Sequence, residues 1–129
     1  MNGKLEWDLK RYLKQSLYND STTYNRILME MIDNPYACTL TSKGFDVTKN
    51  SITFDAIGDS ENILQTVEFG IRMFFVKYST YIEQVIAPYA SVGIRPRDLV
   101  NYAIQNIRVM YNCVCVPVKD DKFHLTIML

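Results

Sequence analysis

The chain has 129 residues, the size of one domain with room for a hydrophobic core. Hydrophobic residues make up 48% of it and charged residues 22%, which excludes a disordered tail or a collagen-like chain. Basic and acidic side chains number 14 each, so no overall field attracts nucleic acid or an anionic membrane. We therefore expect a single folded domain over residues 1–129.

Residue usage and cysteine content bear on origin and location. Amino acids with AT-rich codons, such as Lys, Asn, Ile, Phe and Tyr, are abundant, which favours a low-GC genome such as that of a bacterium or of a virus infecting one. An odd number of cysteines favours reduced thiols, and we find no apolar run typical of a targeting or membrane-spanning segment. These features predict a location in a host cytoplasm or in a virion, with no membrane association.

Two segments near the N-terminus place apolar residues at helical spacing. The second of them ends at Asn34-Pro35, because proline disfavours a helical residue before it. The pattern predicts two helices arranged as a hairpin. The apolar positions are Leu5, Leu9, Tyr12, Leu13 and Leu17, and then Tyr24, Ile27, Leu28, Met31 and Ile32.

The next segment changes to short runs rich in β-branched and aromatic residues. The runs are 36–41, 45–47 and 51–57, and turn-forming residues lie between them at 42–44 and 49–50. This pattern predicts a hairpin or a small antiparallel meander.

A long helix is predicted from Asp59 to Ala87, with Asp59 as its N-cap and Pro88 as its stop. A helix of this length would extend roughly 40 Å, more than the diameter of roughly 26 to 30 Å of such a domain. Either it bends near Gly70, or part of its apolar surface meets a partner. The interface candidates are Phe69, Met73, Tyr78 and Tyr81. A charge introduced at Met73 or Tyr81 is expected to disrupt assembly more than folding.

The C-terminal part predicts a helix followed by a β-hairpin. Pro96 suits a first helical position, and apolar residues continue at helical spacing from Leu99 to Tyr111. Strand-like runs at 113–118 and 123–129 then flank a turn at 119–122, and Pro117 predicts an edge strand or a bulge. The fold class is therefore α+β: an N-terminal helical pair, a small antiparallel sheet, a long central helix, then a helix and a C-terminal hairpin.

The element order in residues 82–129 is also that of a winged helix-turn-helix, a DNA-binding motif. Four polar residues on the second helix could contact base edges: Arg97, Asn101, Gln105 and Arg108. However, any helix with one buried face must fill the other face with polar residues, and Asp120 and Asp121 at the tip of the hairpin would repel phosphates. DNA binding is therefore the alternative rather than the main interpretation.

No spacing of reactive residues marks an active site. His124 is the only histidine and lies on a predicted strand, where a surface or cross-strand position is expected. Together with Cys113 and Cys115 it could supply three zinc ligands, but a structural site needs four. The glycines are too dispersed for a phosphate-binding loop. We predict no metal, no cofactor and no catalysis, with a novel enzyme as the third interpretation.

The main interpretation is a small oligomeric interaction or structural protein, such as a virion component of a phage or other virus, or an inhibitor of a host protein. It would act by surface complementarity, and its partner would be a second copy, another protein, or both. The predicted routes of contact are the aromatic surface of the long helix and strand addition at an edge of the sheet.

Overall fold

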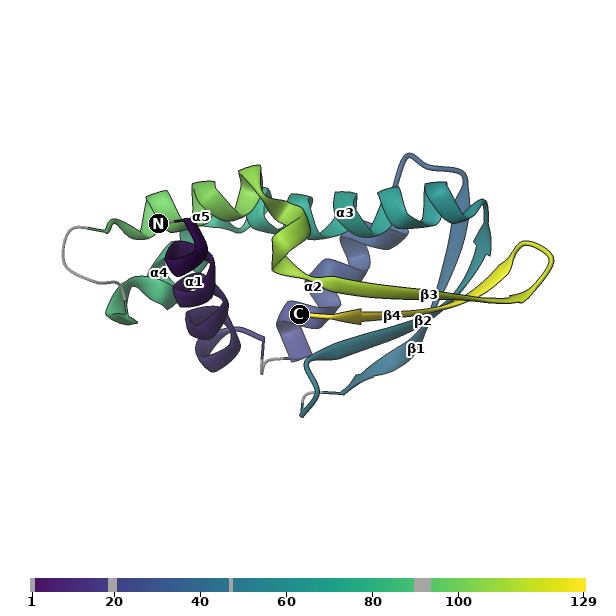
Figure 1. The fold of residues 1–129 in the computed structure, drawn as a ribbon, viewed down its shortest axis with the longest axis horizontal. Coiled ribbons are helices and arrows are strands. Elements are labelled where there is room, and N and C mark those ends of the chain that lie inside the picture. Colours follow the sequence, from purple (N-terminus) through teal and green to yellow (C-terminus); the bar gives the residue numbers. More distant parts are fainter. Residues whose placement is uncertain (1, 19–20, 47, 90–93) are drawn as a thin grey trace.

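The computed structural model describes residues 2–18, 21–46, 48–89 and 94–129. It confirms the predicted α+β class, with two N-terminal helices, an antiparallel sheet and a C-terminal hairpin (Figure 1). The helices and strands in chain order are α1 (Asn2–Ser16), α2 (Ser21–Ile32), β1 (Cys38–Asp46), β2 (Ser51–Gly58), α3 (Ser60–Lys77), α4 (Ser79–Ile86), the 3₁₀ turn η1 (Ala87–Tyr89), α5 (Pro96–Gln105), the 3₁₀ turn η2 (Ile107–Met110), β3 (Asn112–Lys119) and β4 (Lys122–Met128).

Two hairpins form one four-stranded antiparallel sheet in the order β1-β2-β4-β3. The central pairing of β2 with β4 joins the hairpins and places Ile52 opposite Ile127 and Phe54 opposite Leu125. The predicted turn at 42–44 is wrong, because β1 runs through it as one strand with a bulge between Ser42 and Gly44. Gly44 has φ 128°, a value that glycine adopts without the steric cost of a Cβ atom.

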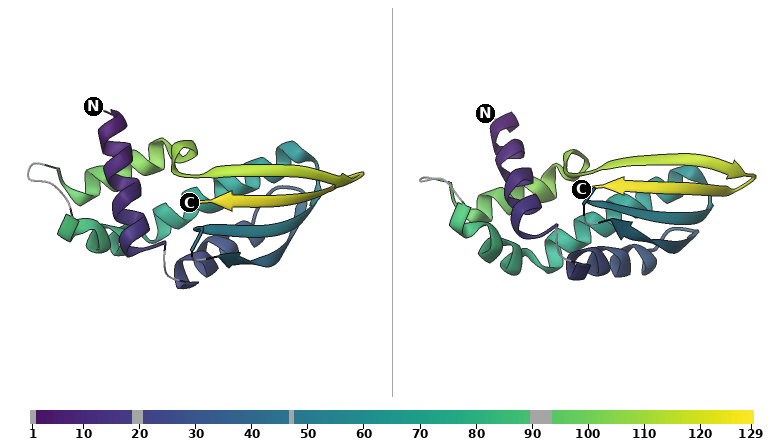
Figure 2. Two further views of the ribbon diagram at one scale, coloured as in Figure 1. Left: turned by 60° about the horizontal axis from the view of Figure 1, so that its bottom comes forward. Right: turned by 90° about the horizontal axis from the view of Figure 1, so that it is seen from below.

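The helices cover only one face of the sheet. α3 runs along the long axis of the molecule and packs on this face together with α2 (Figures 1 and 2). The apolar side chains of β2 and β4 point towards them because side chains alternate between the two faces of a strand. The other face is covered by no helix of the described ranges (Figure 2). The fully or nearly fully buried residues of these two strands are Ile52, Phe54, Ala56, Leu125 and Ile127.

The predicted helix over 59–87 is divided into two. α3 ends at Lys77, and Tyr78 leaves the helical conformation with φ −109° and ψ 23° before α4 begins at Ser79. Tyr78, Ser79 and Thr80 are all weak helix formers, and the change of direction buries Ile82 among other helices. The interruption therefore lies at Tyr78 and not near Gly70, where a bend was one of the two alternatives.

Gly70 instead lies within α3 where α2 crosses closely. A Cβ atom built on it would overlap the side chain of Met31 and lie 3.2 Å from the Met31 Cα atom. Gly70 therefore permits the close contact between α2 and α3.

The helices α1, α4 and α5 form a second helical group, which lies at the end of the molecule opposite to the turn between β3 and β4 (Figure 1). α1 packs against α4 and α5, whereas α2 packs against α3, so the two N-terminal helices do not form the predicted hairpin. Pro96 occupies the start of α5, as predicted. The helix expected up to Tyr111 ends earlier, at Gln105, because Asn106 leaves the helix and its side-chain NH₂ donates to the Tyr102 carbonyl, 3.0 Å away.

Candidate functional site: the edge of the sheet and its groove

β3 forms one edge of the sheet, so one side of its backbone has no partner strand in the described chain. Its register with β4 shifts between Pro117 and Lys119, which confirms both parts of the prediction that Pro117 marks an edge strand or a bulge. Residues that precede Pro117 keep regular pairing with β4. The edge therefore offers a regular row of backbone donors and acceptors over residues 112–116.

The outward side chains of β3 add an apolar surface to this edge. Val114, Val116 and Val118 are 49%, 48% and 66% exposed. Val114 lies opposite Thr126 and Val116 opposite His124 on the face of the sheet that no described helix covers. Three exposed valines in one strand are unusual on a solvated edge, where charged residues commonly prevent association.

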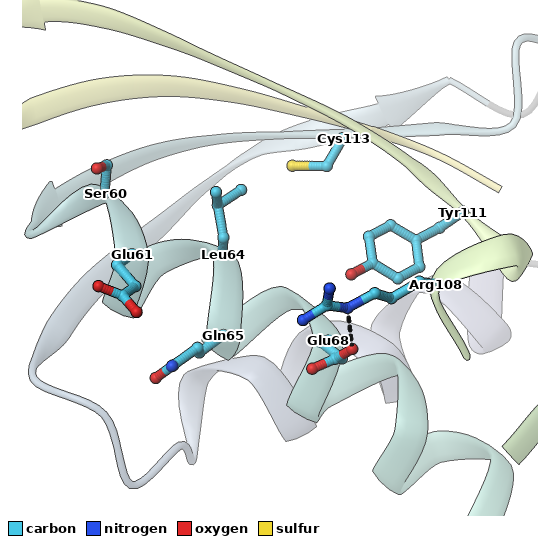
Figure 3. Close-up of a pocket in the computed structure, with 8 residues that line it drawn as sticks. All are labelled: Ser60, Glu61, Leu64, Gln65, Glu68, Arg108, Tyr111 and Cys113. Atoms are coloured by element: carbon cyan, nitrogen blue, oxygen red, sulfur yellow. Dashed lines mark hydrogen bonds and ion pairs between the residues drawn. The ribbon is translucent and has the colours of Figure 1, made fainter. Parts of the chain in front are cut away.

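A groove of about 430 Å³ lies on the other side of the same strand, between β3 and α3 (Figure 3). Leu64 of α3 and Cys113 of β3 point into the space between the two elements, and Leu64 is 44% exposed. The floor of the groove is thus apolar, while its rim is polar. The lining residues are Ser60, Glu61, Leu64, Gln65, Glu68, Arg108, Tyr111 and Cys113.

An ion pair crosses the inner end of the groove (Figure 3). Arg108 Nε donates to Glu68 Oε1 over 2.7 Å, and Arg72 lies 3.9 Å from the same oxygen. This hydrogen bond raises the pKa of the Arg108 guanidinium, so the guanidinium keeps its positive charge across the physiological range. At this end, the groove therefore presents a carboxylate that is already paired with arginine.

The thiols beside the groove are poorly suited to nucleophilic chemistry. Burial, and secondarily the neighbouring Cys115, raises the pKa of Cys113 to about 11 from 9.0. Burial also raises the pKa of Cys115. Reactive cysteines have the opposite shift, because the thiolate is the nucleophile.

We expect Cys113 to react with iodoacetamide roughly tenfold more slowly in the folded than in the urea-unfolded protein, since its smaller thiolate fraction is only partly offset by greater nucleophilicity. Folding favours the neutral form of the Cys113 thiol. The stability that this thiol contributes is therefore complete below its pKa in the unfolded chain, and it is lost as the pH rises through its pKa in the folded protein. Mass spectrometry of labelled Cys115→Ser protein would measure both rates. Equal rates would contradict this expectation.

The predicted interface residues are only partly available. Tyr78 and Tyr81 contact the guanidinium of Arg26, whose carbon lies 4.6 Å and 5.3 Å from their ring centres. Phe69 is half-buried and forms a T-shaped contact with Tyr36, with ring centres 6.1 Å apart. Met73 is also half-buried, and Tyr81 is 38% exposed. Intramolecular contacts thus occupy three of the four side chains.

The predicted DNA-contacting residues are exposed along α5 and η2, but acidic groups accompany both arginines. Arg97 lies 3.7 Å from Glu83 of α4, and Arg108 binds Glu68. Asn101 and Gln105 are exposed between them. The order of α4, α5, β3 and β4 agrees with the winged motif, although the turn at 91–94 lies largely outside the described residues. The hairpin is also built into the sheet through β4 rather than projecting as a separate wing.

The three candidate zinc ligands lie on different faces of the sheet. Cys113 and Cys115 pair with Ile127 and Leu125 on the helix-covered face, whereas His124 pairs with Val116 on the uncovered face. His124 Nδ1 lies 3.4 Å from Asp55 Oδ1 across the β2–β4 pair, in agreement with the predicted cross-strand position. In the described part of the chain, no cluster of three or more His, Cys, Asp or Glu side chains could hold a metal ion.

The groove was not predicted from the sequence, although the alternation of cysteine and valine in 113–118 is a signal of a strand with two different faces.

None of the helices in the described ranges has both the length and the apolar character of a membrane span. Comparisons with protein-family models, with curated proteins and with solved structures gave no match.

Proposed function

We propose that the protein is a non-catalytic interaction protein that binds a strand of a partner along the edge of β3. The observation that carries this proposal is the edge itself: a row of backbone groups over 112–116 that has no partner strand in the described chain, with exposed valines on one side and a groove on the other. In strand addition, backbone hydrogen bonds supply affinity, and alternate side chains of the added strand enter neighbouring pockets. The groove between β3 and α3 would receive one such row of side chains.

The second edge of the sheet is less suitable for a partner. β1 carries a bulge between Ser42 and Gly44. Lys43 lies in this bulge, and its Nζ is 3.2 Å from Asp55 Oδ2, so the two side chains form an ion pair. Bulges and lysines are features by which proteins prevent pairing at an edge. β3 has its proline and its lysine only at positions 117 and 119, beyond the regular segment.

The partner is proposed to be a second copy, another protein, or both, in a host cytoplasm or in a virion. The role would be structural or inhibitory and would depend on shape and apolar contact. The surface of Phe69, Met73, Tyr78 and Tyr81 remains a proposed second contact, supported by the partial exposure of Met73 and Tyr81.

Val116→Lys is expected to weaken partner binding roughly tenfold or more, because the new charge would have to be desolvated beside the added strand. The fold should persist because Val116 is half-exposed at an edge. Binding would be measured by light scattering for self-association and by capture from an extract of the source cells for other proteins. The matched control is Thr39→Lys, an exposed position on β1.

Two other outcomes would identify a different function. Loss of binding in Met73→Lys but not in Val116→Lys would assign the contact to α3 and α4. Salt-sensitive DNA binding that is weakened by Arg97→Ala and Arg108→Ala and unaffected by Val116→Lys would favour the DNA-binding alternative.

A further inference from the structure

We propose that the strand bound by β3 is β3 of a second copy, antiparallel to the first, with a two-fold axis through Val114. This inference rests on the proposed function, because it names the partner of the same edge. Four properties of the described strand lead to it: the position of its proline, its lack of charge, its two different faces and its length.

Pro117 sets the position of the axis. Proline has no backbone N–H, and the strand is irregular between Pro117 and Lys119, so regular pairing is limited to 112–116. The middle residue of this segment is Val114. When the segment pairs with itself over its full length, Val114 lies opposite its own copy and Cys113 lies opposite Cys115 of the second copy.

Charge favours a second copy over a charged partner. Residues 112–118 carry no ionisable side chain other than the two thiols, and the whole chain has zero formal net charge, so two copies do not repel each other. Glu68 lies within ion-pair distance of both Arg108 and Arg72, and Glu61 at the rim brings the formal charge of these four side chains to zero. A partner strand with charged side chains would therefore meet no net opposite charge in the groove and would have to be desolvated.

The two faces of β3 match themselves across the axis. Alternation along the strand places the thiols of the second copy on the same side as Cys113 and Cys115, which is the side of the groove and of the exposed Leu64. Val114 and Val116 of both copies then form one apolar row on the face that no described helix covers. An interface with a two-fold axis needs such a self-complementary surface.

The short paired segment predicts a weak dimer. A stable interface usually buries about 1,600 Å² in total, and five residues a strand provide only part of this area. We therefore expect self-association that depends on concentration in the micromolar range, with a higher average mass at higher protein concentration.

Disulfide cross-linking tests both the partner and the register. In a Cys38→Ser background, the oxidant diamide should convert the opposed thiols into an intermolecular disulfide, since opposed residues of paired strands have suitable Cα separations. Mildly alkaline conditions supply thiolate. The resulting bond joins Cys113 of one copy to Cys115 of the other, the two thiol protons are released, and diamide takes up the two electrons.

Two further variants in the same background make the register specific. Neither Cys113→Ser nor Cys115→Ser alone should form a disulfide dimer, because each bridge needs one residue of each kind. An equimolar mixture of the two variants should form it, since one copy supplies Cys115 and the other supplies Cys113. Circular dichroism checks that both variants are folded.

The inference would be overturned by dimers that persist in either single variant, or by a mixture that forms none. A constant monomer mass across the concentration series would also overturn it. These failures differ from failure of the proposed function, because capture of another protein that is lost in Val116→Lys would still show that the edge of β3 binds a partner strand.

Discussion

Phe74→Ala is expected to lower the free energy of unfolding by about 3–5 kcal/mol, the range found for truncation of a buried phenylalanine. Phe74 is fully buried on α3 at the junction of the two helical groups. Its ring centre lies 5.7 Å from that of Phe75 and 5.6 Å from that of Tyr78. Truncation would leave a cavity beside the residue at which α3 gives way to α4. Urea denaturation followed by circular dichroism would measure the change.

Phe69→Ala is the matched control, because it makes the same substitution on the same helix. The Phe69 ring is half-buried and keeps one edge contact with Tyr36, so we expect a loss of about 1 kcal/mol. Equal losses for the two variants would contradict the greater contribution expected from the fully buried Phe74 ring.

Gly70→Val is expected to cost about 2–3 kcal/mol, because a side chain there must displace α2. The Cβ atom would overlap the side chain of Met31, which is itself fully buried, and the Met31 backbone lies 3.2 Å away. The overpacking cost exceeds the small gain in helix propensity from replacing glycine. The free energy of unfolding from chemical denaturation is again the measurement.

Gly3→Val provides the control for this second variant. Gly3 also lies in a helix, but a Cβ atom on it would meet no other atom within 4 Å, so stability should change by less than about 0.5 kcal/mol. In a Met31→Ala background the cost of Gly70→Val should shrink, since the overlapping side chain is gone. Additive losses would show that Gly70 and Met31 are not in contact.

Local patterns were sufficient to predict most of the individual elements. Helical spacing located α1 and α2, and strand-like runs located both hairpins. Pro117 indicated the edge position of β3 correctly, because the missing N–H of proline has the same consequence in any antiparallel sheet. These predictions succeeded where the signal depends on a residue and its near neighbours.

The failures arise where contacts distant in sequence decide the local conformation. Gly70 looked like a helix bend, but the approach of Met31 from α2 explains the glycine. The helix changes direction at Tyr78 instead, where Ile82 gains burial in the second helical group. The bulge in β1 was likewise mistaken for a turn, since Gly44 fits both.

The candidate site was likewise predictable from the sequence only in part. Its edge strand could be predicted from Pro117, whereas its groove depends on α3 lying beneath β3. Glu68 lies on α3 and Arg108 lies on η2, far apart in the sequence, yet Arg108 Nε is 2.7 Å from Glu68 Oε1. No local spacing relates these two residues, so their contact becomes visible only in the folded chain.

The pairing of β2 with β4 also has a consequence for how the protein is made. Phe54 finds its strand partner only at Leu125, so a ribosome must synthesise residues 122–128 before the two hairpins can join. Closing so long a loop costs chain entropy before any contact repays it, and this slows folding. Until then the apolar face of β2 is covered by α3 without β4 beside it, and an incompletely packed nascent chain is a substrate for chaperones.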